Sequence, residues 1–166
     1  MSDFYTEQLV KKQSGAKEMA IRAGLIVLTV IAVFIVLMFP LGIILPILAV
    51  VLDVFMFRRP NVEYEYLFVN GEFDIDMVMA KSKRKRVKSF NLSEADLVAP
   101  LNSHRMDYYN GNQNMKVLDY SSGNPQHKRF GVITRLDNAT CKIILEPDEA
   151  LAQAMKKTAP SKVFLD

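Results

Sequence analysis

The most concentrated charge in the chain is a basic run at residues 81–88, and its natural chemistry is the binding of anions. Six of its eight side chains are cationic: Lys81, Lys83, Arg84, Lys85, Arg86 and Lys88. Near a membrane, each such residue is attracted to anionic headgroups by about 1 kcal/mol. A second interpretation needs no ligand, because basic residues on a strand beside Asp74 and Asp76 would neutralise those carboxylates. A third, nucleic acid, is disfavoured by a net charge of only +3 and by the lack of aromatic platforms.

Asp53 is the second candidate, because it is the only ionisable residue inside a long apolar stretch. The sequence has no charged side chain between residues 23 and 52. A carboxylate within a membrane is a candidate proton or ion site. Asp53 also lies close in sequence to Arg58 and Arg59, where it could reach the membrane interface or pair with them. We therefore keep a second interpretation, in which these three residues and Arg22 are membrane-interface residues.

The remaining reactive residues do not form a catalytic pattern. His104 and His127 are far apart, and neither has a metal-binding partner at short spacing. Cys141 has no nearby histidine and fits a buried, inert thiol. The segment 104–109 is expected to be a polar, aromatic loop. The sequence contains no glycine-rich phosphate loop, no paired catalytic carboxylates and no nucleophile elbow, so we expect no enzyme, no metal and no cofactor.

The apolar stretch is too long for a single membrane span. Residues 23–57 number about 35, and a straight helix of that length would reach about 52 Å, against a hydrocarbon core of about 30 Å. Pro40 and Pro46, with a glycine between them, lie near its middle and favour a turn. We predict a transmembrane helical hairpin over residues 17–59, with helices at about 17–39 and 41–57. The alternatives are one bent span or a re-entrant loop.

Cationic residues flank this stretch on both sides. They are Lys11, Lys12, Lys17 and Arg22 before it, and Arg58 and Arg59 after it. Because lysine and arginine concentrate on the cytoplasmic side of membranes, both flanks are expected there. The sequence thus predicts a multi-pass protein of the cell membrane with both termini in the cytoplasm. Residues 1–16 would form a cytoplasmic segment, either a short interfacial helix or a flexible tail.

After Pro60 the hydrophobic pattern changes to the period of two that is typical of strands. Apolar residues alternate over 64–69 and over 72–79, and the Asn70-Gly71 pair between them is a strong hairpin signal. A two-residue turn at this point also fixes the register of the hairpin. The predicted pairs on its apolar face are Phe68 with Phe73, Tyr66 with Ile75, and Tyr64 with Met77.

The rest of the chain predicts a strand-rich domain, residues 60–166, that ends in a helix. Further strands are expected at about 84–92, 96–101, 116–120, 129–136 and 140–145, which makes about seven antiparallel strands. Segments 110–114 and 121–125 are loops by composition. An amphipathic helix is expected at about 147–157, because Pro147 suits a first helical position and Lys156 and Lys157 suit the last turn.

A hairpin in the membrane, then short antiparallel strands, then one helix resembles the bacterial pleckstrin-homology-like (PH-like) membrane proteins, in which two spans precede a cytoplasmic PH-like domain. The resemblance is carried by Tyr64–Val69, the Asn70-Gly71 turn, Glu72–Met79, the basic run Lys81–Lys88 and the closing segment Cys141–Lys157. It implies an α+β membrane protein, with an N-terminal transmembrane helical hairpin followed by a PH-like antiparallel β domain and its C-terminal helix.

The resemblance also implies a function. The protein would be a membrane-anchored, non-enzymatic interaction or assembly module that presents a PH-like domain at the cytoplasmic membrane surface. Its partners would be the lipid bilayer, including anionic headgroups, and a partner protein or a second copy of the chain. The alternative is an accessory or pore-lining subunit of a membrane transport complex that uses Asp53.

Overall fold

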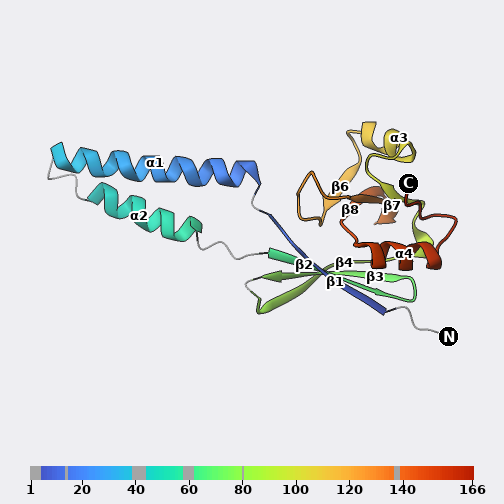
Figure 1. The fold of residues 1–166 in the computed structure, drawn as a ribbon. Helices are drawn as coiled ribbons and strands as arrows, with labels where there is room; N and C mark the ends of the chain where they lie inside the picture. The colour runs from blue at the N-terminus through green and yellow to red at the C-terminus, as the bar shows by residue number, and fades with distance from the viewer. Residues whose placement is uncertain (1–4, 14, 39–43, 58–61, 80, 137–138) are drawn as a thin grey trace. The chain divides into compact units, whose positions relative to one another are not determined.

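The computed structural model describes residues 5–13, 15–38, 44–57, 62–79, 81–136 and 139–166. They belong to two compact units, of which one contains residues 1–13 and 61–166 and the other residues 14–60. The first unit is a β domain with a C-terminal helix, and the second is a pair of apolar helices (Figure 1). The helical pair is therefore an insertion within the β domain. This corrects the predicted order, in which the helices came before a domain that began at residue 60.

The N-terminal segment forms strand β1 (Tyr5–Lys11). It pairs antiparallel with β2 (Val62–Val69) along its whole length. The expectation of an interfacial helix or a flexible tail is therefore wrong. This strand is hard to recognise from its hydrophobic residues, because Leu9 is exposed while its neighbour Val10 is buried. The partner strand, and not the hydrophobic period of β1 itself, determines its structure.

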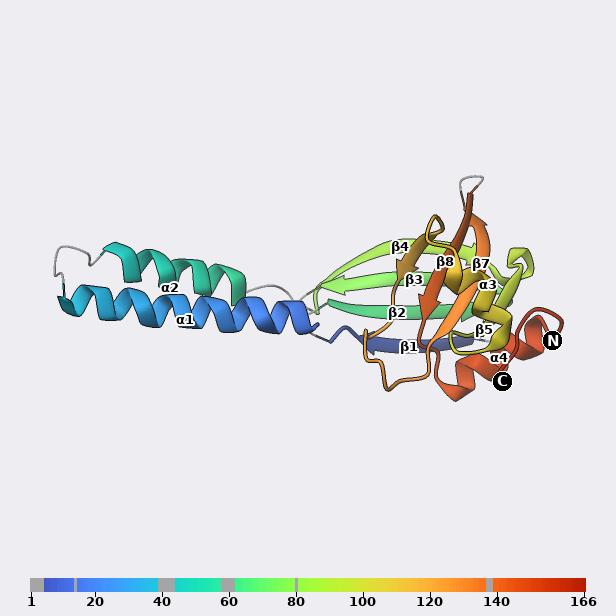
Figure 2. The same cartoon turned by 90° about the horizontal axis from the view of Figure 1, so that it is seen from above.

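The first sheet has the strand order β1-β2-β3-β4, and Figure 2 shows these strands side by side. Its third and fourth strands are β3 (Glu72–Met79) and β4 (Lys83–Asn91). The predicted register is confirmed for all three pairs: Phe68 with Phe73, Tyr66 with Ile75, and Tyr64 with Met77. Asn70 and Gly71 have φ values of 49° and 97°. Positive φ at both positions is what a tight two-residue hairpin turn requires.

A β-bulge interrupts the pairing of β3 with β4. Lys88 lies opposite Ile75, but Arg86 lies opposite the next residue, Asp76, so Val87 is the extra residue of the bulge. An extra residue shifts the alternation of side chains by one position. In β4, each residue before Val87 therefore points to the opposite face of the sheet from the one that strict alternation, counted from Lys88, would predict.

The second sheet has the order β5-β7-β8-β6. Its strands are β5 (Leu97–Pro100), β6 (Lys116–Asp119), β7 (Phe130–Leu136) and β8 (Ala139–Leu145). All four match the predicted strands to within one residue at each end. The direction of β6 differs, because it runs parallel to β8. This corrects the antiparallel expectation. The parallel partners β6 and β8 are not consecutive in the chain. β7 lies between them in sequence, so the connection from β6 to β8 contains a whole strand and has the length that a parallel pair needs.

Short helices complete the β domain. The predicted loop at 104–109 is instead a 3₁₀ turn, η3 (His104–Met106), followed by α3 (Asp107–Gly111). A second 3₁₀ turn, η2 (Leu92–Glu94), follows β4. The predicted C-terminal helix is confirmed as α4 (Glu149–Thr158). The side chain of Asp148 caps it by accepting a hydrogen bond from the Leu151 N–H at 2.8 Å, which satisfies one of the free donors at the helix start.

The core of the β domain is built around aromatic side chains from the first sheet. Phe73 is fully buried, and its ring lies 5.2 to 5.9 Å from three other aromatic rings, those of Tyr66, Phe68 and Phe90. Buried residues of the second sheet and of α4, such as Val132 and Leu151, belong to the same apolar cluster. Both sheets and α4 therefore share one hydrophobic core.

The helical unit consists of α1 (Ala16–Met38) and α2 (Ile44–Phe57). Among the described residues, one helix, Glu18–Met38, is long and apolar enough to cross a membrane, and the apolar segment Ile44–Phe55 is shorter. The predicted turn at Pro40 lies outside the described residues. Pro46 lies in the first turn of α2, where its missing N–H removes no helical hydrogen bond.

The two helices meet along small and polar residues. Ala32 of α1 and Ala49 of α2 are buried, while most of the large apolar side chains around them are exposed. Small residues allow close approach of helices in membranes. Thr29 Oγ1 donates a hydrogen bond to Asp53 Oδ2 at 2.7 Å. Asp53 therefore has a partner on the other helix, and its predicted pairing with the two following arginines lies outside the described residues.

Candidate functional site at the lysine-rich end of the first sheet

Both connections between the β domain and its helical insertion begin at one end of the first sheet. The Lys12 N–H donates a hydrogen bond to the Val62 carbonyl oxygen at 3.0 Å. The turn from β3 to β4 lies at the same end, because Met79 pairs with Val62 on one side and with Lys83 on the other. The basic run therefore begins where the chain leaves for the apolar helices, and we call this the linker end of the sheet.

The two arginines of the basic run are engaged by carboxylates. Arg84 Nη2 lies 2.8 Å from Glu65 Oε1. Arg86 contacts two carboxylates, with its Nη2 3.0 Å from Asp74 Oδ2 and its Nε 3.3 Å from Asp76 Oδ1. For these two residues the structure shows the charge-balancing role that the sequence offered as the alternative to ligand binding.

The lysines lie differently because of the bulge. Lys83 and Lys85 are paired with Met79 and Met77, and so share the face opposite to the carboxylates. Within the described residues, no carboxylate lies within ion-pair distance of any lysine of the basic run. Of these lysines, Lys88 is half-buried and the others are exposed.

Two further lysines that the sequence reasoning did not assign to this surface lie at the same end, where β1 stops. They extend the cluster, which we call the linker-end lysines: Lys11, Lys12, Lys81, Lys83 and Lys85. All five are exposed. Only the pairing of β1 with β2 reveals this grouping, because some 70 residues of sequence separate Lys11 from Lys81. Lys11 pairs in register with Glu63, so it lies on the face of the sheet that carries Arg84, opposite to Lys83 and Lys85. The five lysines therefore surround the linker end and do not share one face, and an anionic surface could meet them at this end of the sheet.

Glu65 lies beside this cluster and is only 1% exposed. It pairs in register with Asp76, and like charges directly opposite each other are unfavourable. Burial raises the pKa of the Glu65 carboxyl, Arg84 lowers it, and Glu7 and Asp76 raise it further, so that the pKa lies above its ordinary value. Replacing the Arg84 guanidinium would therefore leave a buried carboxylate without its cation.

The raised pKa of Glu65 predicts a pH dependence of stability. A carboxyl whose pKa is higher in the folded chain binds its proton more tightly there, so it favours folding at low pH. That contribution is lost as the pH rises from 4.5, the ordinary value, through the raised pKa. We expect the free energy of unfolding of the wild type, relative to Glu65→Gln, to fall across this window. Urea unfolding at a series of pH values measures it, with exposed Glu72→Gln as the control. The expectation would be contradicted if the stability of the wild type relative to Glu72→Gln changed with pH as much as its stability relative to Glu65→Gln.

His127 belongs to a second polar cluster, which is centred on Glu146. His127 Nδ1 lies 2.6 Å from Glu146 Oε1, and the Ser122 hydroxyl donates to Glu146 Oε2 at 2.6 Å. The serine therefore bonds to the carboxylate and not to the imidazole, which is not the arrangement of a nucleophile activated by a base. Tyr66 ties the cluster to the first sheet, because its hydroxyl accepts from the Glu146 N–H at 3.2 Å. Burial raises the pKa of Tyr66 well above its ordinary value.

The other predicted reactive residues are scattered. His104 is exposed, and its Nδ1 lies 3.2 Å from Asp107 Oδ2. Cys141 is buried on β8. Among the described residues, no group of three or more His, Cys, Asp or Glu side chains could hold a metal ion. Arg58 and Arg59, predicted as interface residues, lie outside the described residues, and Arg22 lies within α1.

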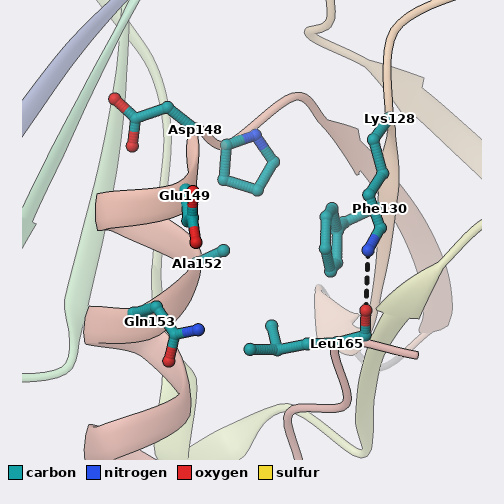
Figure 3. Close-up of a pocket in the computed structure, with 8 residues that line it drawn as sticks. Lys128, Phe130, Asp148, Glu149, Ala152, Gln153 and Leu165 are labelled. Carbon is teal, nitrogen blue, oxygen red and sulfur yellow. Dashed lines mark hydrogen bonds between the residues drawn. The ribbon is translucent and has the colours of Figure 1, made fainter.

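A pocket of about 340 Å³ opens between the first turns of α4 and the start of β7 (Figure 3). Its apolar lining comes from Phe130, Pro147, Ala152 and Leu165. Its Lys128 Nζ donates to the Leu165 carbonyl oxygen at 2.7 Å, and Asp148 caps α4, as described above. Two of its charged side chains are therefore already bonded within the protein, and no catalytic arrangement lines it.

The comparisons with known proteins agree with this fold. The family described as a bacterial PH-like domain (DUF6106) matches residues 2–165. A comparison with curated proteins gave no match, and a comparison with solved structures gave none. The match extends over β1, the helical insertion and the two sheets. The chain therefore belongs to the bacterial PH-like domain family.

Proposed function

We propose that this chain is a membrane-anchored, non-enzymatic interaction or assembly module whose PH-like domain lies at the cytoplasmic membrane surface. One observation carries the proposal: the two ends of the apolar insertion are hydrogen-bonded neighbours, with the Lys12 N–H 3.0 Å from the Val62 oxygen. A chain that enters a bilayer after Lys12 must return to the same side before Val62. The number of crossings is then even, which favours a hairpin over a single span.

The surface of the helical unit supports a lipid environment. Large apolar side chains such as Phe34, Leu37 and Phe55 are more than 60% exposed, and soluble proteins rarely expose apolar surface on this scale. The 23 residues of α1 span about 34 Å, enough for a hydrocarbon core of about 30 Å. The 14 residues of α2 reach only about 21 Å, so the bilayer would thin around this helix or flanking residues would extend to the interface.

The cationic flanks support a cytoplasmic location of the β domain, because lysine and arginine concentrate on that side of membranes. The linker-end lysines would then lie close to the headgroups, since only a few residues separate β1 and β2 from the helices. In this proposal the arginines of the run stabilise the sheet, and the lysines contact anionic lipid. A partner protein or a second copy would bind the remaining surface of the domain.

Membrane extraction tests the anchor. We expect the full chain to stay in the membrane pellet after an alkaline carbonate wash. The control is a variant in which a short Gly-Ser turn replaces residues 14–60, and we call it the hairpin-excised variant. We expect this variant in the supernatant. Release of the full chain by the wash would contradict insertion.

Vesicle binding tests the lysines. We expect the hairpin-excised variant to co-sediment with vesicles that contain phosphatidylglycerol and not with vesicles of phosphatidylcholine alone. Lys83→Gln/Lys85→Gln should weaken this binding about thirtyfold, because each lysine contributes about 1 kcal/mol near an anionic surface.

The matched control is Lys116→Gln/Arg135→Gln, which removes the same charge from exposed positions of the second sheet. It should weaken binding by less than about threefold, a change expected from net charge alone. Equal effects of the two double variants would contradict a specific role for the linker-end lysines.

A further inference from the structure

Strand β4 has an open edge, because it is the last strand of the first sheet. β3 pairs with it on one side, and the strand order β1-β2-β3-β4 leaves its other side without a neighbouring strand. Within the part of the chain that the structure describes, no backbone hydrogen bond joins Lys83–Asn91 to any segment other than β3. The row of N–H and C=O groups on the free side is therefore available to a further strand.

Two other edge strands of the β domain are covered by the chain itself. Along β1, the Gln8 side chain bonds to the Glu146 oxygen and to the Asp148 N–H, each at 2.8 Å. Along β5, Val98 forms a parallel bridge with Val163 of the C-terminal segment. Of these three edges, that of β4 is the one left open among the described residues.

Three lysines of β4 point to the same face of the sheet at this edge: Lys83, Lys85 and Lys88. They lie opposite alternate residues of β3, and alternate residues of a strand share a face. Lys85 and Lys88 are an odd number of positions apart, and they share a face because Val87 is the extra residue of the bulge. As described above, no carboxylate of the described residues lies within ion-pair distance of these lysines. The sheet therefore leaves the charge of this edge unbalanced.

The charge of this edge determines which strand can be added to it. A second copy that added its own β4 would place basic side chains against basic side chains, and like charges that face each other across two strands are unfavourable. Lysine on an edge strand discourages pairing between copies in this way. Acidic side chains opposite the lysines would be attracted instead. An extended acidic segment therefore fits this edge both through its backbone and through its charge.

We infer that the open edge of β4 binds an extended acidic segment of a partner protein, which adds to the four-stranded first sheet as a further strand. The backbone ladder supplies the affinity, and carboxylates that face Lys85 and Lys88 supply the selectivity. This inference names the chemistry of the partner in the proposed function and rests on that proposal. Lys83 and Lys85 also belong to the proposed lipid contact, so the test excludes anionic lipid.

Fluorescence anisotropy tests the inference on the full chain in phosphatidylcholine nanodiscs. The probe is a labelled peptide with the nine-residue length of β4, in which glutamate and valine alternate. We expect saturable binding by the wild type and about tenfold weaker binding by Lys85→Gln/Lys88→Gln, which removes two attractions across the strands. The matched control, Lys116→Gln/Arg135→Gln, removes the same charge from the second sheet and should weaken binding by less than about threefold.

A second peptide separates strand pairing from charge attraction. Methylation of every peptide nitrogen keeps the carboxylates but removes the N–H donors, and should weaken binding at least about tenfold. Equal binding by the methylated peptide, equal weakening by the two double variants, or no binding by the wild type would overturn the inference. It would also be overturned if Lys85→Gln/Lys88→Gln lost binding to phosphatidylglycerol vesicles but kept the peptide, because these lysines would then serve lipid. The membrane anchor is tested separately by the carbonate wash, so a failure of the peptide to bind leaves that result unaffected.

Discussion

A fragment that begins at residue 61 is expected not to fold, whereas the hairpin-excised variant is expected to fold. The difference is strand β1, which the fragment lacks. The Gln8 side chain donates to the Glu146 oxygen at 2.8 Å and accepts from the Asp148 N–H at 2.8 Å, so it joins β1 to the start of the C-terminal helix. Val10 lies in the core, and the Gln13 N–H donates to the Ser122 oxygen at 2.8 Å.

Removal of β1 therefore breaks one edge of the first sheet and its contacts with the second. Small domains have a total stability of about 5–15 kcal/mol, and loss of a whole paired strand is comparable with that total. Circular dichroism and urea unfolding measure the result. The hairpin-excised variant should give a cooperative transition, and the fragment 61–166 should give none. A cooperative transition of the fragment would show that β1 is dispensable.

Phe73→Ala is expected to destabilise the β domain by about 3–5 kcal/mol. Phe73 is fully buried, and its ring stacks on that of Phe90 at a centroid distance of 5.2 Å. Alanine would remove these ring contacts and leave a cavity between β2, β3 and β4. Urea unfolding of the hairpin-excised variant, with and without Phe73→Ala, gives the difference in free energy.

Val69→Ala is the matched control, because Val69 lies at the end of β2 and is 37% exposed. Its cost should stay within about 0.5–1 kcal/mol, as for most surface positions. Similar values for the two variants would mean that the aromatic cluster is not the centre of the core.

The hairpin of β2 and β3 could be predicted in detail because two independent signals agree there. Asn70-Gly71 specifies a two-residue turn, and the alternation of Tyr64, Tyr66 and Phe68 specifies the buried face. The C-terminal helix was predictable for a similar reason, because its end signals and its amphipathic pattern lie within one short segment. Local signals were sufficient for these elements.

Strand β1 and the parallel strand β6 depend on long-range pairing instead. β1 pairs with a strand some 50 residues away, and the apolar helices lie between them in sequence. Neither its seven residues nor the four residues of β6 have a hydrophobic period strong enough to identify the strand or its direction. The insertion of the helices within the β domain was therefore not visible in the sequence.

The basic run stays a predicted site. Five of its six cations are exposed and Lys88 is half-buried, but the sequence treated all six as one surface. The bulge at Val87 separates Arg84 and Arg86, which contact carboxylates, from Lys83 and Lys85, which do not. A bulge has no reliable sequence signal, because it depends on how two strands fit together.

Cysteine labelling of the full chain tests the proposed topology most directly. In a Cys141→Ala background, single cysteines replace Gln13, Leu41 or Asn61, and a membrane-impermeant maleimide is added to intact cells or to inverted membranes. We expect Gln13→Cys and Asn61→Cys to react only in inverted membranes and Leu41→Cys only in intact cells. Labelling of the cysteines at positions 13 and 61 from opposite sides of the membrane would contradict the hairpin.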